Sequence, residues 1–239
     1  KIKIDEKIKF FFKKLLPSIF SSGVTQINIL VGTIIASFQA GAVSYLYYAD
    51  RVYQINLAVA GIAVGTVMLP ELSKYIKNND IKKVNDLQNR SLELSLFLSL
   101  PAAVALIIAS EQIVTSLFGY GLFDSNSVTN TALALYFFAF GIPAFSMLKI
   151  LSNLFFARND TKTPFYLSII SVSLNVIISV SLFAKFGFII IAIATSISSW
   201  INVLMHYFFI KKRNLHTFDP QFIYKIPRMI LSVVVMVSV

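Results

Sequence analysis

Six apolar stretches, each about as long as a membrane is thick, constrain this chain more than any other feature. They cover approximately residues 15–38, 44–72, 92–109, 131–156, 165–183 and 187–210, and a seventh begins near residue 226. A helix needs about 20 apolar residues to cross the hydrocarbon core, and each full stretch is close to that length. The stretches are continuous rather than alternating at period two, which argues against a transmembrane barrel. The sequence therefore predicts an all-α, polytopic helical membrane protein with six full transmembrane helices and a truncated seventh.

Composition supports transport rather than catalysis. The chain is 56% hydrophobic and 13% charged, whereas about a quarter of the residues of a soluble domain are charged. It has no cysteine, which excludes a disulfide framework, thiol catalysis and cysteine metal sites. Its two histidines, His206 and His216, are expected to be solvated at the membrane interface. No loop is long enough for an ATPase, kinase or hydrolase domain, and no pair of acids is spaced for acid/base catalysis.

The cations predict the orientation of the chain. Lysine and arginine gather before the first apolar stretch and in every second connection after it, whereas the other connections hold only Lys185. By the positive-inside rule the basic segments are cytoplasmic. The formal net charge of +10 then serves orientation and contact with anionic lipid headgroups rather than nucleic-acid binding. The predicted organisation is a cytoplasmic basic segment (1–14), a transmembrane lobe (15–210), a cytoplasmic basic loop (211–225) and a truncated further transmembrane helix (226–239).

Local patterns refine this organisation. Residues 78–90 form an amphipathic pattern, which predicts a helix along the inner membrane surface. Pro101 and Pro143 fall inside apolar stretches and predict kinks, whereas Pro227 is expected in the first turn of its helix. The spacing of Gly61 and Gly65 is a small-residue pair of the kind that lets helices approach closely. The chain begins without methionine and ends in a hydrophobic run, so we expect a fragment of a longer protein.

Arg51 lies at a depth where a charge is costly. If the second apolar helix begins near residue 44, Arg51 is about 10 Å along it, inside the hydrocarbon region. Such a charge either faces a protein interior or cavity or extends to the interface. Arg51 and Lys149 are the two cations within apolar stretches, and Asp50 is the acid beside them. Excess positive charge suits an anionic ligand, and the planar donor fork of arginine suits phosphate.

Other polar residues also interrupt the apolar stretches. We single out Asn28, Ser44, Asp50, Gln54, Asn153, Asn175, Ser179 and Thr195. Each could instead make an interhelical hydrogen bond, which is the commoner role of such residues in membrane bundles. Taken alone, composition and pattern predict a transporter or channel with a cationic cavity.

Several motifs occur in an order that resembles a known family. They are Gln26-Ile27-Asn28, Ala36-Ser37-Phe38, Tyr47-Tyr48-Ala49-Asp50-Arg51, Gly65-Thr66-Val67-Met68-Leu69-Pro70-Glu71-Leu72-Ser73, Leu117-Phe118-Gly119-Tyr120-Gly121 and Phe156-Ala157-Arg158-Asn159-Asp160-Thr161-Lys162-Thr163-Pro164. Together these motifs extend over much of the chain and resemble the C-terminal lobe of the MurJ/MviN lipid II flippases. That family belongs to the multidrug/oligosaccharidyl-lipid/polysaccharide exporter superfamily.

The resemblance implies one lobe of a two-lobed, alternating-access transporter of about fourteen spans. Such a protein moves lipid II, the undecaprenyl-pyrophosphate-linked peptidoglycan precursor, from the inner to the outer leaflet of the bacterial cytoplasmic membrane without hydrolysing ATP. It implies no enzyme activity and no cofactor, with sodium or proton coupling. The implied partners are lipid II, membrane lipids, the N-terminal lobe of the same protein and cell-wall synthesis proteins, with no nucleic acid.

The resemblance also assigns residues. Arg51 matches a cavity arginine expected to contact the pyrophosphate, with Asp50 beside it. The other implied substrate-binding residues are Ser44, Gln54, Asn28 and Lys149. Some family members bind sodium in this lobe, and Asn175, Ser179 and Thr195 could be remnants of that site. Gly32 stands where a first-helix acidic ligand would fall, which argues against sodium coordination here.

Two alternatives fit the same sequence. The first is an exporter of another lipid-linked oligosaccharide or of drugs in the same superfamily. The second is a non-transporting membrane scaffold, for which the polar cavity residues would be dispensable. An intramembrane enzyme is disfavoured because histidine and acid clusters are missing from the sequence.

Overall fold

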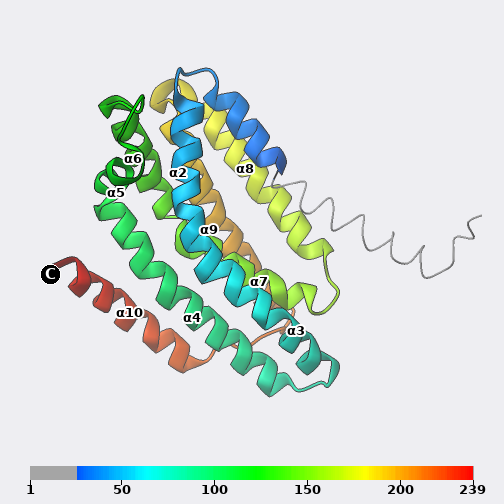
Figure 1. Cartoon of the computed structure of the whole chain (residues 1–239). Coiled ribbons are helices and arrows are strands. Elements are labelled where there is room, and N and C mark those ends of the chain that lie inside the picture. The colour runs from blue at the N-terminus through cyan, green and yellow to red at the C-terminus, as the bar shows by residue number, and fades with distance from the viewer. Residues whose placement is uncertain (1–25, 239) are drawn as a thin grey trace, which may run out of the picture.

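The computed structural model describes residues 26–238 as a bundle of helices, with no strand in that part of the chain (Figure 1). After a first helix, Gln26–Ala36, the elements are α2 (Ala42–Leu57), the π-helix η1 (Ala58–Ala63), α3 (Val64–Lys77), α4 (Ile81–Ile108), α5 (Ser110–Phe118), α6 (Ser125–Ala139), α7 (Ile142–Phe156), α8 (Lys162–Phe186), α9 (Ile189–Lys212) and α10 (Pro220–Ser238). The prediction of an all-α fold is confirmed.

Four helical segments are long and apolar enough to cross a membrane: Ala42–Lys77, Ile81–Ile108, Lys162–Phe186 and Ile189–Lys212. Helices α6 and α7 would add a fifth if they form one span, bent by 44°. Pro143 lies at the start of α7, so the kink predicted there is present. The first predicted stretch contributes the apolar helix Gln26–Ala36, and its beginning lies outside the described residues.

Two local predictions are wrong. Residues 78–90 do not form a separate surface helix, because α4 continues without a break from Ile81 to Ile108. Only part of this segment packs within the protein: Val84 is buried and Gln88 donates to the carbonyl of Ile150 on α7 at 3.3 Å, whereas Ile81 is 71% exposed. Helix α10 begins at Pro220, so Pro227 lies inside the helix rather than in its first turn.

Two buried clusters form the core. The first includes Leu46, Leu135 and Ile142, together with further side chains of α4, α5 and α9. The second joins α3, α4, α7 and α9 and includes Leu72 and Leu92. Because lipid tails are as apolar as these side chains, close packing rather than water exclusion holds such helices together.

Small residues allow α3 and η1 to pack closely on α7. A Cβ atom at Gly61 would lie 3.1 Å from the Cα of Ser146, and one at Gly65 would lie 3.1 Å from Nδ2 of Asn153. Asn153 donates to the carbonyl of Gly65 at 2.6 Å. The predicted Gly61–Gly65 pair therefore lies at a helix contact, and Asn153 has the interhelical role expected of a polar residue in a bundle.

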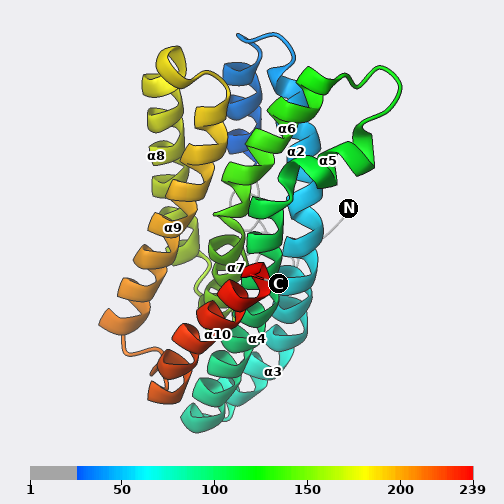
Figure 2. The ribbon, with the colours of Figure 1, turned by 90° about the vertical axis from the view of Figure 1, so that its left-hand side faces the viewer.

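Two turns at the same end of the bundle are tied together. Figure 1 shows the helix Gln26–Ala36 beside α8, and Figure 2 shows α8 and α9 running side by side. The side chain of Gln39, in the turn before α2, accepts a hydrogen bond from the backbone of Phe188 at 2.8 Å. This contact fixes the helix Gln26–Ala36 and α2 relative to α8 and α9, and these four helices surround the cavity described next.

Candidate functional site

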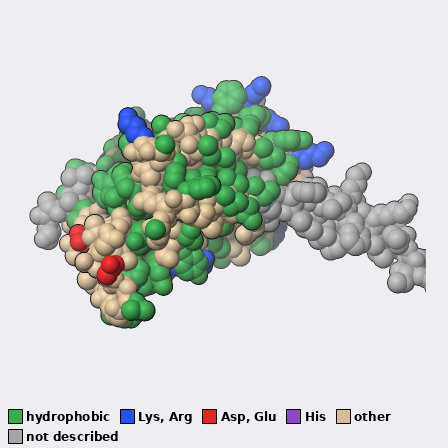
Figure 3. All heavy atoms as spheres, turned by 90° about the horizontal axis from the view of Figure 1, so that it is seen from above, with side chains coloured by type: hydrophobic (Ala, Val, Ile, Leu, Met, Phe, Trp, Pro, Cys, Tyr) green, Lys and Arg blue, Asp and Glu red, His purple; other side chains and the backbone are tan. Residues whose placement is uncertain are grey.

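A cavity of about 250 Å³ opens between the helix Gln26–Ala36, α2, α8 and α9. It is lined by Asn28, Ile29, Gly32, Thr33, Ala36, Val43, Leu46, Tyr47, Asp50, Arg51, Tyr53, Gln54, Phe138, Asn175, Ile191 and Thr195. Seen from above in Figure 3, hydrophobic side chains are interspersed with other side chains and backbone. Along the helices many large hydrophobic side chains are exposed, among them Ile55, Val67 and Ile177, so the cavity gathers polar and charged side chains in an otherwise apolar bundle.

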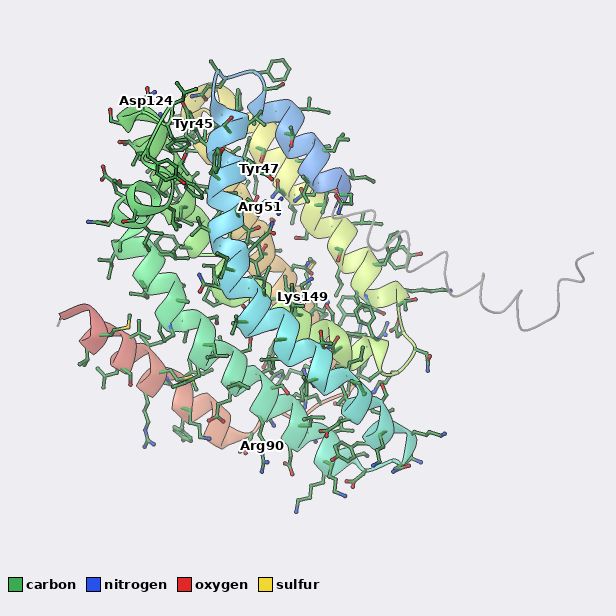
Figure 4. All side chains as sticks on the ribbon, viewed as in Figure 1. Tyr45, Tyr47, Arg51, Arg90, Asp124 and Lys149 are labelled. Atoms are coloured by element: carbon green, nitrogen blue, oxygen red, sulfur yellow. The ribbon has the colours of Figure 1, made fainter. Side chains whose placement is uncertain are left out.

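Arg51 lies on the wall of this cavity with its hydrogen-bond donors available. Its guanidinium carbon is 4.7 Å from the centre of the Tyr47 ring, and Figure 4 shows the two labelled side chains together on α2. Among the residues that the structure describes, Arg51 forms no hydrogen bond or salt bridge. An arginine with free donors can bind two oxygens of one phosphate group at once.

Asp50 does not neutralise Arg51 through a direct ion pair. Successive residues point about 100° apart around a helix, and the carboxylate of Asp50 is occupied on its own side. It accepts hydrogen bonds from Nε2 of Gln54 and from the hydroxyl of Tyr53. The cavity therefore keeps a cation whose donors are free beside an acid that accepts hydrogen bonds from other residues.

The three residues that the resemblance relates to a sodium site lie close together, and two of them, Asn175 and Thr195, line the wall opposite α2. Asn175 donates through Nδ2 to Oγ1 of Thr195 at 3.0 Å, and Ser179 donates to Oδ1 of Asn175 at 3.4 Å. Thr195 in turn donates to the carbonyl of Ile191 at 2.7 Å. A hard cation needs several oxygen lone pairs directed at one point, whereas these groups use theirs on one another. No carboxylate belongs to this set in the part of the chain that is described.

The six predicted substrate-binding residues divide into two sets. Asn28, Asp50, Arg51 and Gln54 line the cavity, and Oδ1 of Asn28 is buried without a partner among the described residues. Ser44 and Lys149 do not belong to the lining. Ser44 is exposed on α2 about two turns before Arg51, and Lys149 is exposed on α7, closer to α3 in Figure 4.

Sequence reasoning missed the three lining residues that carry a hydroxyl group besides Thr195, namely Tyr47, Tyr53 and Thr33. The position of Tyr47 was open to prediction, because it precedes Arg51 by four residues and so lies on the same face of the helix. Tyr53 and Thr33 carry no such pattern, and their place depends on how the helices pack.

A second polar group surrounds the loop between α9 and α10, and we call it the loop cluster. It consists of Asn85, Asn89, Arg158, Asp160, Thr163, Arg213, His216 and Thr217. Asn89 donates to the carbonyl of Thr217 at 3.2 Å, and Arg158 donates to the carbonyls of Leu154 at 3.0 Å and Leu215 at 2.9 Å. Arg213 forms a salt bridge with Asp160 at 2.7 Å.

Both histidines are buried, so the prediction that they are solvated is wrong. His206 is 1% exposed, and its Nδ1 lies 3.0 Å from the carbonyl of Asn202, its Nε2 3.3 Å from the hydroxyl of Ser152. His216 lies in the loop cluster between the side chains of Asn85 and Asn89. Burial, and next the charge of Arg158, lower the pKa of His216 to about 4. His216 is therefore neutral at pH 7.

Comparison with known proteins decides the family. The model of the family described as "Lipid II flippase MurJ" matches residues 1–239 of this chain. The chain belongs to the MurJ family. A probable lipid II flippase MurJ of Rhizobium meliloti (strain 1021) is 39% identical over 236 residues, which cover 99% of this chain and 44% of the relative. One from Rickettsia prowazekii (strain Madrid E) is 39% identical over 213 residues, covering 89% of this chain and 42% of the relative.

Solved structures agree with this assignment. A lipid II flippase MurJ in an inward closed conformation matches with a TM-score of 0.82 and 32% identity, covering 95% of this chain and 48% of that one. An outward-facing multidrug resistance MATE transporter of the MOP superfamily matches with a TM-score of 0.73 at 19% identity, over 86% of this chain and 46% of that one, which shows a shared fold. MurJ is a family of flippases, so the chain belongs to a transporter family of membrane proteins rather than to an enzyme family. The chain spans about half the length of these relatives or less.

Proposed function

We propose that this chain forms one lobe of a bacterial lipid II flippase, with the cavity beside Arg51 holding the pyrophosphate of the lipid. The observation that carries the proposal is an arginine with free donors in a cavity of an otherwise apolar bundle. A charge at that depth is costly unless it serves a ligand or a water-filled path. A lipid-linked pyrophosphate has both the negative charge and the hydrocarbon tail that this setting suits.

Each lining residue has a part in binding the anion. Arg51 donates two parallel hydrogen bonds to phosphate oxygens, and Asn28 and Gln54 orient the headgroup from either side. Asp50 accepts hydrogen bonds from Gln54 and Tyr53. Lys149 supplies further positive charge toward the α3 end, where it meets the headgroup at another stage of its passage.

A second lobe completes the cavity in this proposal. Arg51 and Lys149 are both exposed on this chain, and the chain covers only 44% of its Rhizobium relative. Two lobes that rock about the cavity would open it alternately to either leaflet. We propose that the basic connections face the cytoplasm, as the positive-inside rule predicts, and that the protein lies in the bacterial cytoplasmic membrane, where enzymes of cell-wall synthesis contact it.

Coupling to a cation belongs to the proposal as well. The residues Asn175, Ser179 and Thr195 hydrogen-bond one another, which supports a packing role rather than sodium binding. Asp50 is the one acid among the residues that line the cavity, so a proton is the cation that we propose this lobe carries.

The test measures lipid II on the outer leaflet of cells depleted of their own flippase. The full gene product is expressed as wild type, Arg51→Ala and Arg51→Lys at equal levels. Arg90→Ala is the matched control, because Arg90 is exposed on α4 away from the cavity (Figure 4). We expect Arg51→Ala to lower exposure at least about tenfold, since hydrogen bonds to charged groups contribute about 1.5–3 kcal/mol, and Arg90→Ala to leave it unchanged.

Two results would contradict the proposal. If the wild type does not restore outer-leaflet lipid II, the substrate is wrong, and an exporter of another molecule or a scaffold explains the protein better. If the wild type restores exposure and Arg51→Ala does so equally, the cavity at Arg51 does not hold the pyrophosphate.

A further inference from the structure

The guanidinium of Arg51 is placed by an aromatic ring rather than by a hydrogen bond. Its Cζ lies 4.7 Å from the centre of the Tyr47 ring, one helical turn away on the same face of α2. Tyr47 lines the cavity and is 54% exposed. A cation above the face of an aromatic ring is attracted by the negative charge of that face, and the attraction is stronger away from water.

The Tyr47 ring is itself held from behind. It meets the Tyr48 ring edge-on, with centroids 5.9 Å apart. The Tyr48 ring lies 4.8 Å from that of Phe118 at the end of α5, and 5.2 Å from that of Phe123 in the following loop. Four aromatic residues from two parts of the chain thus form a row that ends at Arg51.

Arg51 needs such a support because another partner is close in sequence. Asp50 precedes it directly, and a long flexible arginine side chain can turn toward a neighbouring carboxylate at low dielectric. An ion pair with Asp50 would use the donors that a phosphate needs. Stacking on Tyr47 leaves the edge of the guanidinium, with its N–H groups, free to meet an anion.

We propose that Tyr47 is a positioning residue, whose ring holds the Arg51 guanidinium toward the cavity and so raises affinity for a pyrophosphate headgroup. The inference rests on the proposed function, in which Arg51 binds the pyrophosphate in the cavity. It requires the ring and not the hydroxyl of Tyr47. Tyr47→Phe should therefore keep the affinity for the headgroup, whereas Tyr47→Leu, which has no ring, should lower it.

The experiment measures the binding of undecaprenyl pyrophosphate to the purified full-length protein in detergent, by thermophoresis, with undecaprenol as the ligand without charge. We expect Tyr47→Leu to weaken pyrophosphate binding about three- to tenfold, the range of a partly desolvated cation–π contact, and Tyr47→Phe to change it less than about twofold. Arg51→Ala should weaken it at least about tenfold. Tyr166→Leu is the control, because Tyr166 is 61% exposed on α8 and does not line the cavity.

A double variant separates positioning from a general structural role. Once Arg51 is alanine, Tyr47 has nothing to position, so Tyr47→Leu should cause no further loss in that background. An equal further loss would overturn the inference. So would unchanged binding in Tyr47→Leu while Arg51→Ala loses affinity, or a loss in Tyr47→Phe as large as in Tyr47→Leu. If Arg51→Ala itself binds undecaprenyl pyrophosphate like the wild type, the proposed function fails first.

Discussion

The cavity and the loop cluster are both polar regions in an apolar bundle, and they differ in how their polar groups are paired. In the loop cluster, Arg158 donates to two backbone carbonyls and Arg213 pairs with Asp160. In the cavity, Arg51 is exposed and its donors have no partner among the described residues. These donors remain available to an anion, whereas those of the two arginines in the loop cluster are already used.

The two arginines Arg51 and Arg158 show what this difference teaches. Both lie in motifs of the resemblance, but the sequence singles out only Arg51, because it alone of the two lies within an apolar stretch. The structure assigns Arg158 to holding a loop and leaves Arg51 open to an anion. We therefore expect substitutions in the loop cluster to lower the free energy of unfolding, and substitutions in the cavity to weaken ligand binding.

The largest expected effect is on stability, from Arg158→Ala. Removing this side chain leaves the carbonyls of Leu154 and Leu215 without their partner, at a cost of about 2–3 kcal/mol in the free energy of unfolding. Unfolding in mixed micelles measures this cost, and binding of undecaprenyl pyrophosphate by the remaining folded protein should match the wild type. If Arg51→Ala destabilises the protein as much as Arg158→Ala does, the proposed difference between the cavity and the loop cluster is wrong.

The loop cluster should also weaken in acid through His216. The pKa of this side chain is about 4 in the folded protein, against an ordinary value of 6.5. Between these values the unfolded chain binds a proton that the folded protein does not, so stability is lost as the pH falls from about 6.5 toward 4. We expect a loss of roughly 1–3 kcal/mol that His216→Gln reduces. An equal acid sensitivity in His216→Gln would assign the effect elsewhere.

A smaller effect is expected from Asn28→Ala in the cavity. Because Oδ1 of Asn28 has no partner among the described residues, its removal should change the free energy of unfolding by less than about 0.5 kcal/mol. In the proposed complex the side chain of Asn28 donates to a phosphate oxygen through Nδ2, so binding of undecaprenyl pyrophosphate should weaken about three- to tenfold, measured as for Tyr47. A clear loss of stability without a loss of binding would place Asn28 with the paired, structural residues.

The smallest effect concerns sodium. Since Asn175, Ser179 and Thr195 use their polar groups on one another, replacing sodium by potassium should change lipid II flipping in liposomes by less than about twofold. A matched pH series on the same liposomes tests the proton. A strong sodium requirement that Thr195→Val abolishes would show that these residues rearrange into a cation site.

The sequence was sufficient for the features that depend on local pattern. Apolar stretches of membrane length predicted the helices, because in lipid each backbone must satisfy its own hydrogen bonds. The depth of Arg51 in an apolar stretch indicated a place on a cavity, which the structure shows, and the motifs of the chain predicted the family. Asn28, Asp50, Arg51 and Gln54 were correctly placed together, since two helices of one lobe present them.

Only the tertiary structure decided which partner each polar group has. Residues 78–90 look like a surface helix until α7 covers part of their apolar face, and His216 looks solvated until its loop packs on Asn85 and Asn89, more than a hundred residues earlier. Arg51 lies over the ring of Tyr47, whereas the neighbouring carboxylate of Asp50 accepts from Gln54. The periodicity of apolar residues indicates which face of a helix is apolar. Which helix packs against this face depends on contacts between segments far apart in the chain.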